Sequence, residues 1–159
     1  GIIYIMNRSI EKSISKNEFM KKILRLKTTL YSLIIILFLL LAYFLIPFPV
    51  PIKRTLFSVV VILGFIFFML GIILTFMAKK EKGKLKLFLM LTGISAIAPF
   101  IFSILHNLFY GLAITFENFE LIFEILSASF FIIAIIVAPI MFVVGIVGSL
   151  VFLRASQSG

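Results

Sequence analysis

The chain has no cysteine, no aspartate and only one histidine among its 159 residues. Without cysteine, a disulfide framework, a thiolate nucleophile and a Cys-ligated metal are all excluded. Without aspartate and a second histidine, a Ser-His-Asp triad, a two-His metal motif and an EF-hand loop each lack a necessary part. We therefore expect the protein not to be an enzyme and to hold no metal or cofactor.

Charged residues are also scarce. They make up 13% of the chain, whereas 63% of the residues are hydrophobic, and the mean hydropathy is +1.29. A soluble domain of this size needs a polar surface and could not bury so much Ile, Leu and Phe. The composition predicts an all-α, multi-pass membrane protein.

Four apolar runs are long enough, or nearly so, to cross a bilayer core as helices, which takes roughly 20 residues. They lie at about 30–46, 56–78, 87–114 and 125–153. The first run is too long for a signal peptide and no small-residue cleavage site follows it, so we expect a permanent helix. The sequence predicts a four-transmembrane-helix bundle over residues 29–154, followed by a short tail at 155–159. Residues 1–5 precede Met6, a natural start, and are left out of this fold prediction.

Positive charge is distributed unevenly between the two sides of these spans. Of the 15 basic residues, 13 lie before the first span, between the second and third, or after the fourth, and only Lys53 and Arg54 lie on the other side. The positive-inside rule therefore predicts a cell-membrane protein with both termini in the cytoplasm. The loop 115–124, which carries three glutamates and no cation, then faces outward.

Residues 1–28 combine seven cations with apolar side chains at near-helical spacing, such as Ile10, Ile14 and Leu24. This pattern predicts an amphipathic helix on the membrane surface whose cations bind anionic lipid head groups, with an interruption around residues 13–18. The formal charge of +9 does not indicate nucleic-acid binding, because no aromatic or Gly-rich recognition surface accompanies it.

Small residues recur at heptad-like steps on two spans, where they allow helices to approach closely. Gly64 and Gly71 mark such a stripe on the second span. A longer stripe on the fourth comprises Ser127, Ala134, Ala138, Gly145 and Ser149. We expect both stripes to be helix-packing faces.

The third span has the only chemically mixed face. Pro99 on this span and Pro139 on the fourth fall at similar depth, and each should bend its helix. We hypothesise that the two spans separate beyond these prolines and frame a cavity open to the outside. Its lining would be Ser103, His106, Asn107 and Tyr110, with Glu117 of the outer loop above them. The alternative is that these residues sit at the membrane interface and bind head groups or backbone carbonyls.

The sequence points to function only by elimination. It favours a non-catalytic accessory subunit or oligomeric scaffold that acts through helix–helix and lipid contacts, as a homo-oligomer or within a larger membrane complex. The alternative is an oligomeric channel or carrier for a small solute or ion, using the polar face of the third span. Against that alternative, no Asp, Glu, Lys or Arg lies well inside a span.

Overall fold

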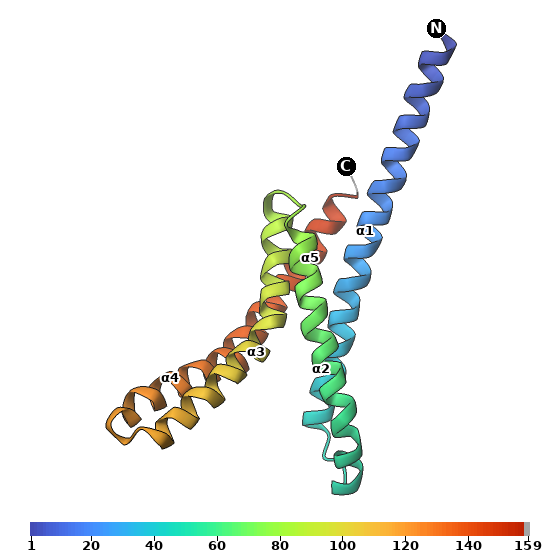
Figure 1. The fold of residues 1–159 in the computed structure, drawn as a ribbon. Helices are drawn as coiled ribbons and strands as arrows, with labels where there is room; N and C mark the ends of the chain where they lie inside the picture. Colours follow the sequence, from blue (N-terminus) through green and yellow to red (C-terminus); the bar gives the residue numbers. More distant parts are fainter. Residues whose placement is uncertain (158–159) are drawn as a thin grey trace.

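The computed structural model describes residues 1–157, which are helical apart from short connections (Figure 1). Its helices are α1 (Ile2–Leu45), α2 (Val50–Ala78), α3 (Gly83–Thr115), η1 (Glu117–Phe119), α4 (Glu120–Ile132), η2 (Ile133–Val137) and α5 (Ala138–Ala155). Four helical stretches are long and apolar enough to cross a membrane: α1, α2, α3 and the continuous stretch Glu117–Ala155. The prediction of an all-helical chain with four apolar spans is confirmed. The last two residues of the predicted tail lie outside the described residues.

The connections between helices follow from proline and glycine. Helix α1 ends at Leu45, just before Pro47, and α2 already begins at Val50. Pro51 lies in the first turn of α2, before the second span predicted at 56–78, where a missing N–H breaks no hydrogen bond. Gly83 opens α3 at φ +63°, a left-handed conformation that favours glycine.

The basic segment 1–28 is not a separate helix. It continues into the first span as part of α1, a single helix of 44 residues, or about 66 Å at 1.5 Å per residue. The expected interruption at 13–18 is absent from α1, which contains neither proline nor glycine. Residues 1–22 are all exposed, and the amino-terminal part of α1 projects beyond the other helices (Figure 1). The segment is therefore helical, as predicted, but it is continuous with the first apolar run and not a helix of its own. Its place on the membrane surface stays a prediction.

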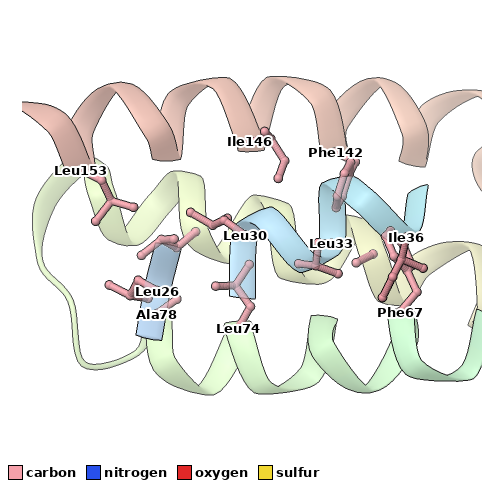
Figure 2. Packing of buried hydrophobic residues seen from close by; sticks show 12 residues of the cluster. Leu26, Leu30, Leu33, Ile36, Phe67, Leu74, Ala78, Phe142, Ile146 and Leu153 are labelled. Atoms are coloured by element: carbon pink, nitrogen blue, oxygen red, sulfur yellow. The ribbon is translucent and has the colours of Figure 1, made fainter. Parts of the chain in front are cut away.

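The hydrophobic core uses residues from all four spans but occupies only part of their length. It includes Leu30 and Leu33 of α1, Leu74 of α2, Leu89 of α3 and Leu153 of α5, each no more than 1% exposed. Figure 2 shows side chains of α1, α2 and α5 pointing toward one another in this cluster. Its members from α2, α3 and α5 come from residues 67–78, 89–96 and 142–153. The core thus fills the half of the protein nearest the connection 79–82.

In the other half, the helices separate into two pairs. Helix α3 packs against α2 and α5 near the core, and against α4 farther along. Figure 1 shows α3 and α4 leaving α1 and α2 together, as one helical hairpin diverging from another. The four-helix bundle is therefore complete over only one half of the structure.

Helix α3 and the continuous stretch Glu117–Ala155 each contain a proline near the middle. Pro99 lies inside α3, which bends in its middle portion (Figure 1). Pro139 lies in the first turn of α5 and follows the π-helix η2, where the amide of Ala138 donates to the carbonyl of Ile133. Proline has no N–H to donate and disrupts the α-helical pattern at this point. The wider π turn before Pro139 is one way in which a helix accommodates that loss.

Candidate functional site

His106 of α3 and Ser127 of α4 join these two helices in the part of the diverging hairpin that lies beyond Pro99, away from the core. Nδ1 of His106 lies 2.8 Å from Oγ of Ser127 and 3.0 Å from the Ser127 carbonyl oxygen. Oγ of Ser127 also donates to the carbonyl of His106 over 3.2 Å. Ser127 is 3% exposed. The two residues are 21 positions apart and meet because the chain reverses around η1.

The hydrogen-bond pattern assigns the proton on the imidazole. The carbonyl of Ser127 can only accept, so Nδ1 of His106 must donate to it. The hydroxyl of Ser127 donates to the His106 carbonyl, and its oxygen can accept from the same Nδ1–H. We therefore assign a proton to Nδ1, so that this nitrogen makes the contact with Ser127 and Nε2 is the ring nitrogen left outside it.

An open hollow of about 610 Å³ lies beside this histidine. It is lined by His106, Tyr110, Glu124, Ser127, Ala128, Phe131 and Ile132. The imidazole packs against the rings of Tyr110 and Phe131, at centroid distances of 6.3 and 5.3 Å. The hollow therefore has a mostly apolar wall with the imidazole and one carboxylate on it.

The hollow is not the cavity that the sequence suggested. We expected the third and fourth spans to separate beyond their prolines, but α3 and α4 stay in contact and bend away together. Stacked or tilted aromatic pairs hold them, including Phe102 with Phe130 and Phe109 with Phe123, at centroid distances of 5.7 and 6.0 Å. The separation lies instead between the α1–α2 pair and the α3–α4 pair.

Only two of the five residues predicted to line the cavity meet at the hollow, namely His106 and Tyr110. The amide of Asn107 donates to the carbonyl of Ser103 over 2.9 Å within α3, and both residues are exposed. Glu117 lies in η1 and is exposed, outside the hollow lining. Glu124 takes its place as the acidic residue of the hollow.

Most of the predicted packing residues lie at helix contacts. Ala134, Ala138 and Ser149 are no more than 3% exposed. A Cβ added to Gly71 would lie 3.0 Å from the carbonyl oxygen of Gly93 on α3, and one added to Gly145 would lie 2.7 Å from the backbone nitrogen of Thr92. At these two glycines, helix backbones approach too closely for a larger residue.

Gly64 is different, although it follows the same heptad as Gly71. The described chain places nothing within 4 Å of a Cβ added there, because α3 has already turned away from α2. Conversely, Gly93 belongs to neither predicted stripe, yet a Cβ added to it would lie 2.9 Å from the carbonyl oxygen of Gly71. Gly93 lies about 100° around α3 from Thr92 of the polar face, and no small residue stands seven positions before or after it, so no stripe marked it.

A double-mutant cycle tests the connection between His106 and Ser127. His106→Phe and Ser127→Ala, measured singly and together, are expected to show a coupling energy of about 1 kcal/mol, since interhelical hydrogen bonds in membrane proteins contribute about 0.6–1.7 kcal/mol. The measurement is the free energy of unfolding in mixed detergent micelles.

The matched control is Ser129→Ala, because this hydroxyl donates within its own helix, to the carbonyl of Ile125 over 2.8 Å. Its coupling to His106→Phe is expected to be under about 0.3 kcal/mol, within normal additivity. Equal coupling in the two cycles would contradict a direct hydrogen bond between α3 and α4.

The chemistry available at the hollow is limited. Ser127 is buried and its hydroxyl is bonded to the His106 backbone, so it does not point at a substrate position. Within residues 1–157, no group of three His, Asp or Glu side chains is arranged to hold a metal ion. The arrangement presents one imidazole nitrogen, Nε2, and one carboxylate, that of Glu124. The chain matches no protein-family model, and no curated protein or solved structure is detectably similar to it.

Proposed function

We propose that this chain is a non-catalytic integral membrane protein that acts by associating with further transmembrane helices, as a homo-oligomer or as a subunit of a larger complex. The observation that carries the proposal is the separation of the two helical hairpins over half of their length. Faces of α2 and α3 that would meet in a complete bundle remain open there.

Two glycines mark these open faces. Gly64 lies two turns from Gly71, on the side of α2 that packs against α3 nearer the core. Gly111 lies 18 residues, or five turns, beyond Gly93 on α3. The described chain places nothing within 4 Å of a Cβ added at either Gly64 or Gly111. Small residues on an exposed apolar face allow another helix to approach closely.

Polar side chains within the spans support association over catalysis or transport. Thr75 and Thr92 donate to carbonyls of their own helices, at 2.9 and 2.8 Å, and both pack at helix contacts. His106, on which a carrier or channel would depend, is bonded to Ser127. These groups serve the contacts between helices, so we propose no catalytic role for them.

We further propose that the protein lies in the cell membrane with both termini in the cytoplasm. The amino-terminal part of α1, the connection 79–82 and the carboxyl end of α5 lie toward the same end of the protein (Figure 1). Lys22 pairs with Glu81 over 2.7 Å, and Lys27 donates to Gln157 over 2.9 Å. One end therefore gathers most of the cations, which the positive-inside rule assigns to the cytoplasm.

The association is tested by native mass spectrometry of the protein extracted in a mild detergent. We expect a species heavier than the single 18.0 kDa chain, and we expect the double variant Gly64→Leu, Gly111→Leu to lose it, because leucine would hold a neighbouring helix away from both faces. The mass itself distinguishes a second copy from a different subunit.

The matched control is Ser58→Leu, an exposed position about 120° around α2 from Gly64. It is expected to keep the heavier species. A monomer from the unmodified chain, or equal loss in the control, would contradict association through these faces. A saturable ion or solute flux in liposomes that disappears with His106→Ala would instead favour a carrier or channel.

A further inference from the structure

A groove lies between α1 and α2 at the cation-rich end of the protein. It has a volume of about 460 Å³ and is more enclosed than the hollow beside His106. Its wall includes the side chains of Lys21, Lys22, Arg25, Lys80, Glu18 and Glu81. Its remaining lining is apolar and comes from Leu26, Ile73 and Met77. The groove is therefore strongly charged along one part and apolar along the other.

The positive charge of the groove exceeds its negative charge. Glu81, whose side chain is 11% exposed, is paired with Lys22 at 2.7 Å. Glu18 and Lys21 form a looser and more exposed pair at 3.8 Å. Within residues 1–157, Arg25 and Lys80 are paired with no carboxylate. These two cations, one on α1 and one in the α2–α3 connection, leave the groove suited to an anion.

The ion pair between Lys22 and Glu81 also helps to shape the groove. It joins α1 to the connection that carries Lys80, so that the cations of the two segments face a common space. Because the carboxylate is largely shielded from solvent, this pair is screened less than a surface pair. The groove is thus shaped by a specific ion pair between α1 and the connection 79–82, as well as by the lysines along it.

The apolar part of the groove lies where the membrane span begins. Ile73 and Met77 belong to the apolar run that ends at Ala78, directly before Lys79. Ile73 is 45% exposed and Leu26 is 1% exposed. The groove therefore crosses the boundary between the polar end of the helices and their apolar spans. A molecule that matches it must carry a negative charge at one end and a hydrocarbon chain at the other.

We propose that this groove binds an anionic phospholipid, with the phosphate between Arg25 and Lys80 and an acyl chain along Ile73 and Met77. Basic pockets between membrane helices on the cytoplasmic side are a known type of site for such head groups. A soluble phosphate or phosphate ester would match the cations but would leave the apolar part of the groove uncovered. The lysine-rich arm of α1 is the part before the groove, residues 1–17, and it attracts anionic lipids through its charge alone. The groove differs from the arm because it requires Arg25, Lys80 and an apolar wall.

The experiment is a lipid titration of the full chain in detergent, followed by native mass spectrometry, with phosphatidylglycerol and phosphatidylcholine as the two lipids. Phosphatidylglycerol is expected to bind as a discrete first lipid, and phosphatidylcholine more weakly. The double variant Arg25→Gln, Lys80→Gln is expected to weaken the binding of phosphatidylglycerol by about thirtyfold, because each cation near an anionic lipid contributes a factor of about five.

Two further variants separate this site from general electrostatics. Lys12→Gln with Lys16→Gln removes the same charge from the exposed arm, outside the groove, and is expected to change the affinity by less than about twofold. Ile73→Trp leaves every charge in place but fills the path of the acyl chain, so it is expected to weaken binding. Glycerol phosphate in millimolar excess, which has a head group and no acyl chain, is expected not to compete.

Three results would overturn the proposal. One is an unchanged affinity in the Arg25→Gln, Lys80→Gln variant. Another is an equal loss in the Lys12→Gln, Lys16→Gln variant, which would mean that the whole arm attracts lipid without a site. The third is displacement of the lipid by glycerol phosphate, which would mean that the groove recognises a soluble phosphate. None of these results depends on whether the protein associates through Gly64 and Gly111.

Discussion

Gly145→Ala is expected to lower the free energy of unfolding by about 2–3 kcal/mol, which is large for the addition of one methyl group. The new Cβ would lie 2.5 Å from Oγ1 and 2.7 Å from the backbone nitrogen of Thr92. A side chain can rotate away, but a backbone nitrogen cannot, so α3 and α5 would have to move apart. That movement would also separate the buried hydroxyls of Thr92 and Ser149, which lie 3.5 Å apart.

Gly111→Ala, compared in the dissociated single chain, is the matched control, because it makes the same chemical change in α3 at a position where the described chain leaves open space around the added Cβ. Alanine is a better helix former than glycine by about 1 kcal/mol, so this variant is expected to be unchanged or slightly more stable. Unfolding of both variants in mixed micelles, followed by circular dichroism, provides the comparison. Equal destabilisation would mean that the effect comes from glycine as such and not from the contact between α3 and α5.

The packing stripes show what the spacing of small residues along one helix can predict about helix contacts, and what it cannot. Heptad spacing correctly drew attention to Gly71 and Gly145, since a small residue every two turns is what a close helix contact requires. The same spacing included Gly64, which lies at no close contact within residues 1–157. Periodicity on one helix indicates which face can pack, but not where its neighbour bends away. The neighbour here is α3, which bends near Pro99, and no spacing on α2 predicts that bend.

The amino-terminal segment illustrates a second limit. Apolar residues at helical spacing correctly predicted a helix between Arg8 and Lys27, but not its connection to the first span. Residues 2–45 contain neither proline nor glycine, so no strong helix-breaking signal separates the segment from that span. Ser13, Ser15 and Asn17 can cap a helix, but they are also tolerated within one. The continuity of α1 depends on that absence of a helix-breaking residue.

The contact between His106 and Ser127 could not be derived from the sequence. It depends on the register of α3 against α4, which is set by the short reversal around η1 and by aromatic pairs such as Phe109 with Phe123. The sequence marked His106 as a polar residue near the membrane interface and Ser127 as part of a packing stripe. Ser127 is buried at a helix contact as that stripe predicts, but only the three-dimensional arrangement brings the two residues together.

The proposed orientation leads to the second large prediction. Because the chain contains no cysteine, a single introduced thiol is the only site for a maleimide reagent. Glu117→Cys and Lys82→Cys place that thiol at exposed positions at opposite ends of α3, in η1 and in the connection before Gly83. In intact cells, a membrane-impermeant maleimide is expected to label the Glu117→Cys variant almost completely and to leave the Lys82→Cys variant unlabelled.

The physical reason is the distribution of cations. Reversing the protein would move the arm of α1, the lysines of 79–86 and Arg154 across the membrane together, against the bias that retains Lys and Arg in the cytoplasm. Permeabilised cells are the control, because both variants should then be labelled equally if both thiols are accessible. Labelling of Lys82→Cys but not Glu117→Cys in intact cells would mean that the arm and the lipid groove face outward. The anionic lipids of the cytoplasmic leaflet could then no longer reach Arg25 and Lys80.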